Sequence, residues 1–73
     1  MNSIESPSHY NQGKVECIDA IESAVTGLYG IDAVYTGNII KYMFRWKHKN
    51  GLEDLKKARQ YLDWLIKKNE ETM

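Results

Sequence analysis

The chain has 73 residues, with ten basic and ten acidic side chains, so it forms one domain at most and lacks the strongly basic balance of a duplex-DNA binder. Its single cysteine, Cys17, excludes an intramolecular disulfide and indicates a reducing, intracellular setting. No apolar run reaches the length of a membrane span, and we expect no signal peptide at the N-terminus.

The formal net charge of zero hides a segregation of charge along the chain. Residues 1–40 carry one basic and five acidic side chains, whereas residues 41–73 carry nine basic and five acidic side chains. Salt bridges within or between chains explain such a pattern, and so does a basic site for a small anion. A chain of this length buries only about 60% of its unfolded surface, so we expect self-association to add buried area. Two tryptophans and five tyrosines are suitable interface material.

Residues 1–13 are polar, contain the only proline and are predicted to form an ordered N-terminal arm. Pro7 has a fixed φ angle and favours an extended conformation at Ser6, which disfavours a helix here. A first helix is predicted from about Val15 to Val25. Its apolar positions recur at spacings of three, four and three residues, as in an amphipathic helix. They are Ile18, Ile21, Val25 and Leu28.

A second helix is predicted from about Asp32 or Tyr35 to Lys47. Gly37 lies inside this helix, where glycine costs about 1 kcal/mol relative to alanine. This glycine therefore indicates either a break in the helix or a close approach of backbone or ligand at that point.

The second helix separates polar from apolar side chains when it is drawn at 100° per residue. The polar arc, roughly 100° wide, holds Asn38, Lys41, Tyr42 and Arg45, and the opposite arc holds Ile39, Ile40, Met43, Phe44 and Trp46. Arginine binds phosphate with two hydrogen bonds, lysine adds a point charge, asparagine reads polar edges and tyrosine stacks or hydrogen-bonds. The polar arc therefore fits a planar ligand that carries phosphate, and it equally fits an ordinary solvated helix face.

The third helix is predicted from about Leu52 to Asn69, after a turn at Asn50. Asn50 and Glu53 have the spacing of a capping box that begins this helix. One stripe of apolar side chains follows the helix, and it consists of Leu55, Ala58, Leu62, Leu65 and Ile66. Residues 70–73 are predicted to fray.

Trp64 lies outside the apolar stripe of the third helix, among charged side chains. An exposed tryptophan in such a place is typical of an oligomer or partner contact. Together with the wide apolar arc of the second helix, it favours a symmetric homo-oligomer, with a tetramer as the first choice. The predicted fold is therefore all-α, a small three-helix domain with an ordered arm.

Three segments of the chain, taken in order, resemble the SaV-like family of small bacteriophage proteins. They are Pro7-Ser8-His9-Tyr10 with Val15 to Glu22, then Gly37 to Tyr42 with Arg45, then Gly51 to Ala58 with Tyr61 and Leu62. The resemblance covers nearly the whole chain and identifies residues 1–73 as a single SaV-like helical domain. One departure is visible, because the family usually has His-Pro where this chain has Ser6-Pro7. A ligand contact from that first histidine is therefore in doubt here.

The resemblance implies nucleotide-type ligands by two routes. A related domain occurs in a larger phage protein that is described as a nucleotide kinase. Small phage proteins of similar appearance act as sponges, which hold the cyclic dinucleotide signals of bacterial antiphage immunity inside a homotetramer. Because a cyclic dinucleotide and an isologous dimer interface are both two-fold symmetric, one short chain needs to supply only half of a pocket.

Catalysis is the less favoured interpretation. The chain has no glycine-rich phosphate loop of the G-x-x-x-x-G-K-[ST] type, and no catalytic triad can be identified from local spacing. His9 and His48 stand apart without close metal-binding partners, so no metal or other cofactor is expected. Binding requires only cations for phosphates, flat rings for bases and polar groups for base edges.

The predicted ligand-binding residues are His9, Tyr10, Asn38, Lys41, Tyr42 and Arg45. Further ligand or interface residues are Pro7, Ser8, Lys14, Lys56, Tyr61 and Trp64. For His9 and Tyr10 the alternative is packing over the first helix, and for Tyr61 it is packing between helices. For Lys56 and its neighbour Lys57 the alternative is a solvated face.

The sequence thus favours a phage immune-evasion protein, not an enzyme, that sequesters a cyclic dinucleotide such as cyclic GMP-AMP in the cytoplasm of the infected bacterium. Its expected partners are this or another nucleotide and further copies of itself, without duplex nucleic acid or membrane. Two alternatives stay open. One is a nucleoside monophosphate kinase-like protein of phage nucleotide metabolism, and the other is a protein-interaction module that inhibits a host factor.

Overall fold

The computed structural model describes residues 13–72, which form three α-helices joined by turns. They are α1 (Cys17–Ala24), α2 (Ile31–Arg45) and α3 (Leu52–Glu71), and residues 13–72 contain no strand. The predicted all-α, three-helix fold is therefore confirmed. The predicted N-terminal arm, with His9 and Tyr10, lies outside the described residues, apart from Gly13.

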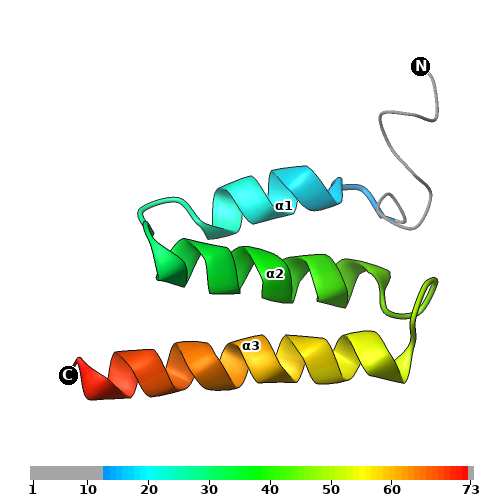
Figure 1. The fold of residues 1–73 in the computed structure, drawn as a ribbon. Helices are drawn as coiled ribbons and strands as arrows, with labels where there is room; N and C mark the ends of the chain where they lie inside the picture. The colour runs from blue at the N-terminus through cyan, green and yellow to red at the C-terminus, as the bar shows by residue number, and fades with distance from the viewer. Residues whose placement is uncertain (1–12, 73) are drawn as a thin grey trace.

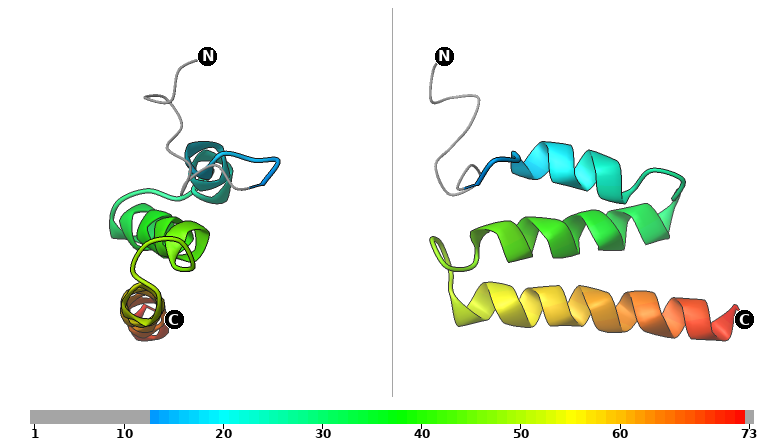
Figure 2. Two further views of the ribbon diagram at one scale, coloured as in Figure 1. Left: turned by 90° about the vertical axis from the view of Figure 1, so that its right-hand side faces the viewer. Right: turned by 180° about the vertical axis from the view of Figure 1, so that it is seen from behind.

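The three helices lie side by side in one layer. Figure 1 shows α2 between α1 and α3, and the end-on view in Figure 2 shows the three helices stacked in the same order. The principal extents are 45 × 28 × 17 Å. A single layer leaves both of its broad faces uncovered.

The helix boundaries differ from the predicted ones at several ends. Helix α1 is shorter than predicted, because the chain leaves it at Val25 and turns through Gly27, whose φ is +84°. Helix α2 ends at Arg45 instead of Lys47, and α3 continues to Glu71 instead of Asn69.

The predicted capping box at the start of α3 is wrong. The helix begins after Gly51, which has a φ of +57° and makes no side-chain cap. Asn50 uses its side chain differently, because its amide Nδ2 donates a hydrogen bond to Asp54 Oδ1 at 3.1 Å. The turn that ends at Gly51 thus takes Asn50 away from the capping position and directs it to Asp54.

Gly37 marks a close approach between helices. Helix α2 continues through it without a break, and a Cβ added at Gly37 would lie 3.4 Å from Ile21 Cγ2 of α1. A methyl group fits at that distance, but a larger side chain would push α1 away. Of the two interpretations that the sequence allowed, the close approach is the one observed.

Few apolar side chains within residues 13–72 are buried. Those that are buried are Cys17, Tyr42 and Ala58. The predicted stripe of α3 faces α2 only in part, because Leu62 is 44% and Ile66 47% exposed. The side of α3 that packs on α2 carries the buried Asp54 together with Ala58 of the predicted stripe, so it overlaps the predicted side only in part.

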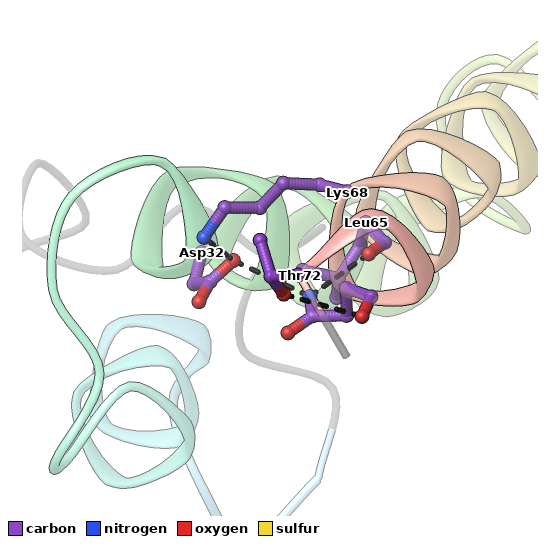
Figure 3. A network of polar contacts seen from close by, with 5 residues as sticks. Asp32, Leu65, Lys68 and Thr72 are labelled. Carbon is purple, nitrogen blue, oxygen red and sulfur yellow. Dashed lines mark hydrogen bonds and ion pairs between the residues drawn. The ribbon is translucent and has the colours of Figure 1, made fainter.

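A polar contact holds the far end of α3 against the start of α2. Figure 3 shows Lys68 of α3 reaching to Asp32, with Nζ 2.9 Å from Oδ1. The hydrogen bond from Lys68 lowers the pKa of the Asp32 carboxyl below its ordinary value. No helix within residues 13–72 has the length and apolar character needed to cross a membrane.

Candidate functional site

The last turn of α2 meets the first turn of α3 at a buried ion pair. Arg45 Nε lies 3.0 Å from Asp54 Oδ2, and Arg45 Nη2 lies 3.3 Å from Asp54 Oδ1. Asp54 is fully buried and Arg45 is only 9% exposed. The short turn between the helices brings the two residues together, and the planar guanidinium engages both carboxylate oxygens.

Opposing effects act on the Asp54 carboxyl. Burial raises its pKa, but the hydrogen bonds from Arg45 and Asn50, together with the charges of Arg45 and Lys57, lower the pKa by more. The net result is a pKa below the ordinary value of 3.8. Asp54 is therefore a carboxylate at neutral pH, with both oxygens engaged, which suits a structural role better than that of a general base.

Three cations surround the ring of Tyr42. Lys41 Nζ lies 4.9 Å from the ring centroid, Arg45 Cζ lies 4.9 Å from it, and Lys57 Nζ lies 5.7 Å from it. These distances are typical of cation–π contacts. We call Lys41, Tyr42, Arg45, Asp54 and Lys57 the Tyr42 cluster. With three cations and one carboxylate, its formal charge is +2.

An aromatic row continues from the Tyr42 cluster along the contact of α2 with α3. Tyr42 stacks on Tyr61, with ring centroids 5.9 Å apart and planes inclined by 19°. Tyr61 then meets Trp64 edge-on at 5.4 Å, and Tyr35 lies 6.0 Å from each of these two rings. Trp64 is 46% exposed, so the row ends at the protein surface.

The structure brings together part of the predicted polar arc of α2. Lys41, Tyr42 and Arg45 gather around one ring, but Tyr42 and Arg45 are buried against α3. Asn38 is partly buried one turn earlier on the same helix. The arc is therefore an inter-helix face more than a solvated surface, and Lys41 is its most accessible cation.

The remaining predicted residues fall into three groups. Tyr61 and Trp64 belong to the aromatic row. Lys14 and Lys56 are exposed and form no ion pair within residues 13–72. Pro7 and Ser8, like His9 and Tyr10, lie outside the described residues.

Sequence reasoning missed Asp54, Lys57 and Tyr35 as members of this region. The sequence contained a signal for the position of Asp54. An acidic residue in the first turn of a helix lies close to the last turn of the preceding helix when a short connection makes the two helices antiparallel. Lys57, like Lys56, was interpreted as part of a solvated face of α3. Its contact with the Tyr42 ring depends on the packing of α3 against α2.

Burial also affects Cys17, next to the Tyr42 cluster. Burial raises the pKa of the Cys17 thiol, and the positive charge of Lys41 opposes this only in part. Within residues 13–72 no three His, Cys, Asp or Glu side chains are grouped so as to hold a metal ion. The chemistry that the described site offers is therefore that of cations beside aromatic rings.

The lowered pKa of Asp54 predicts how stability depends on pH. A carboxyl whose pKa is lower in the folded state than in the unfolded state stabilises the fold above the unfolded pKa. We therefore expect the Asp54 contribution to be complete above about pH 4 and to be lost as the pH falls through the folded pKa. Thermal melts of wild type and Asp54→Asn over this range test this, because the variant is expected to show the weaker dependence on pH. Equal slopes would contradict the assignment.

Comparison with known proteins places the chain in a family. Residues 4–63 match a family described as a protein of unknown function, DUF3310. The chain belongs to the DUF3310 family. All members of the Tyr42 cluster lie inside the matched part of this DUF3310 protein, whereas Trp64 directly follows it. No curated protein and no solved structure matches the chain.

Proposed function

We propose that this DUF3310 protein is a bacteriophage immune-evasion protein that binds and sequesters a cyclic dinucleotide, such as cyclic GMP-AMP, without cleaving it. It would act in the cytoplasm of the infected bacterium and block antiphage signalling by removing the signal. The observation that carries the proposal is the net positive Tyr42 cluster, which stands beside an aromatic row. The SaV-like resemblance supports the same ligand class.

The phosphate contacts are assigned to Lys41 and Lys57. Both ammonium groups lie beside the Tyr42 ring, and neither forms an ion pair within residues 13–72. Arg45 contributes positive potential, but Asp54 fixes its guanidinium in place. A phosphodiester near Lys41 and Lys57 would therefore meet two ammonium groups whose only ion pair among residues 13–72 would be the one to the ligand.

The base contacts are assigned to the exposed end of the aromatic row. Trp64 offers an accessible ring, whereas Tyr42 is buried and stacked on Tyr61. Stacking of a base on an aromatic side chain is worth about 1–3 kcal/mol and tolerates any base. His9 and Tyr10 stay in the proposal as ligand residues from the N-terminal segment, which lies outside the described residues.

Assembly into a symmetric homotetramer completes the proposed pocket. A tetramer with three two-fold axes needs two different isologous interfaces, and each two-fold axis matches the symmetry of a cyclic dinucleotide. The arrangement of the helices in one layer (Figure 2) supports assembly, since a single layer cannot cover its own apolar side chains. Tyr29, Val34 and Met43 are examples, each at least 48% exposed.

A calorimetric panel of nucleoside mono-, di- and triphosphates and cyclic dinucleotides tests this function. We expect saturable binding of a cyclic dinucleotide and recovery of the intact ligand after the complex is heated. Phosphoryl transfer from ATP to a nucleoside monophosphate would instead establish the kinase-like alternative. Absence of binding to every nucleotide would contradict the proposal and favour a module that inhibits a host protein.

A further inference from the structure

A second apolar stripe follows the outer side of α3. Four apolar residues recur along this stripe at spacings of three, seven and four residues: Leu52, Leu55, Leu62 and Ile66. Arg59 occupies the position of the repeat between Leu55 and Leu62. This is the a/d pattern of a helix that pairs with another helix. Leu52 is 64%, Leu62 44% and Ile66 47% exposed, so α2 does not cover this side.

The outer stripe and the Tyr42 cluster occupy different sides of α3. At 100° per residue, Lys57 and Trp64 lie roughly 160° around the helix from Leu55 and Leu62 respectively. A partner bound to the stripe therefore leaves Lys57 and Trp64 accessible.

We infer that the occupant of this stripe is the same stripe of a second copy, packed antiparallel about a two-fold axis. In this register Leu55 of one copy lies against Ile66 of the other, Arg59 lies against Leu62 near the axis, and Leu52 lies against Asn69. With 20 residues, α3 is about 30 Å long, so the seam continues along the whole helix.

Charge complementarity selects the second copy and the antiparallel direction. Lys56 and Asp63 are exposed beside the stripe, and neither forms an ion pair within residues 13–72. In the antiparallel register Lys56 of each copy lies near Asp63 of the other. A parallel pair would set Arg59 against Arg59, which like-charge repulsion disfavours, and would put Lys56 of one copy on the opposite side of the seam from Asp63 of the other.

This inference rests on the homo-oligomer in the proposed function and identifies one of its two interfaces. It does not depend on which ligand binds. The aromatic row with Trp64 is then left for the second interface, where two Tyr42 clusters would face one ligand.

Light scattering on the full chain tests the interface. Leu62→Arg, which sets a second positive charge against Arg59 of the other copy, is expected to reduce the molar mass of the assembly at least twofold at micromolar concentration, with helix content retained. Gln60→Arg is the matched control, because it adds the same charge to an exposed residue of α3, roughly 130° from the middle of the stripe. An unchanged mass for Leu62→Arg, or an equal loss for Gln60→Arg, would overturn the inference.

Cross-linking tests the direction of pairing even if Leu62→Arg fails to fold. A Leu55→Cys chain and an Ile66→Cys chain are refolded together and treated with a short bis-maleimide, with the wild type and its buried Cys17 as the blank. We expect linked dimers mainly in the mixture. Cross-linking within each variant alone would indicate a parallel pair. No cross-linking in any sample would show that these side chains do not meet between copies. Either result overturns the inference. An intact seam without nucleotide binding would refute only the proposed function.

Discussion

Asp54→Ala is expected to lower the free energy of unfolding by about 3–5 kcal/mol. The substitution removes the partner of a guanidinium that is only 9% exposed and leaves a buried charge without its carboxylate. Native domains are stable by about 5–15 kcal/mol, so a loss of this size leaves a small chain close to unfolding. Urea denaturation followed by circular dichroism measures the change.

A matched control for this prediction is Glu70→Ala, which removes a carboxylate from an exposed position of the same helix. Its free energy of unfolding is expected to stay within about 0.5 kcal/mol of the wild type. A loss below about 1 kcal/mol for Asp54→Ala would show that the ion pair contributes no more than an exposed pair does.

The same ion pair changes what Arg45→Ala can test. Loss of a phosphate contact at Arg45, one of the predicted ligand-binding residues, would by itself weaken nucleotide binding by roughly tenfold to a hundredfold, since such a hydrogen bond contributes about 1.5–3 kcal/mol. In the structure this substitution also strands the buried Asp54 carboxylate, so we expect it to destabilise the protein. Lys41 and Lys57 are therefore the better positions at which to measure ligand contacts.

Lys41→Ala and Lys57→Ala are each expected to weaken cyclic dinucleotide binding by roughly tenfold to a hundredfold. A hydrogen bond to a charged group contributes about 1.5–3 kcal/mol, and each lysine is assigned one phosphate. Neither side chain forms an ion pair within residues 13–72, so the fold is expected to persist. Calorimetry gives the dissociation constants, and circular dichroism checks the helix content.

Lys67→Ala serves as the control for binding, because it removes a lysine from an exposed position of α3 that is distant in sequence from the Tyr42 cluster. It is expected to bind the ligand as the wild type does. Equal binding by the wild type and both cluster variants would exclude Lys41 and Lys57 as phosphate ligands. An equal loss in all three variants would show a general effect of charge.

The sequence was sufficient for the helices because each one has a clear apolar period. The predicted third helix begins at the observed residue, Leu52, and α2 continues through Gly37 as one of the two interpretations allowed. The predicted ends of the helices were less accurate where the backbone conformation of the turn determines the end. The capping role predicted for Asn50 was wrong because Gly51, with a positive φ, precedes the helix.

The candidate site was predictable only in part, because periodicity gives the spacing of side chains and not the neighbour that they face. Lys41, Tyr42 and Arg45 were correctly grouped on one arc, but nothing local to α2 indicated that this arc would meet Asp54 and Lys57 of α3. The apolar stripe of α3 misled for the same reason. Its outer members, Leu62 and Ile66, are half-exposed in a single-layer chain.

The most direct test of the central claim is a ¹H–¹⁵N correlation spectrum of the labelled chain, titrated with cyclic GMP-AMP. We predict saturable shifts of the amides around Lys41, Tyr42 and Lys57 and of the Trp64 indole, while amides around Gly27, in the turn after the far end of α1, stay in place. No shift at saturating ligand, or shifts confined to residues away from the Tyr42 cluster, would contradict the claim that this cluster binds the nucleotide.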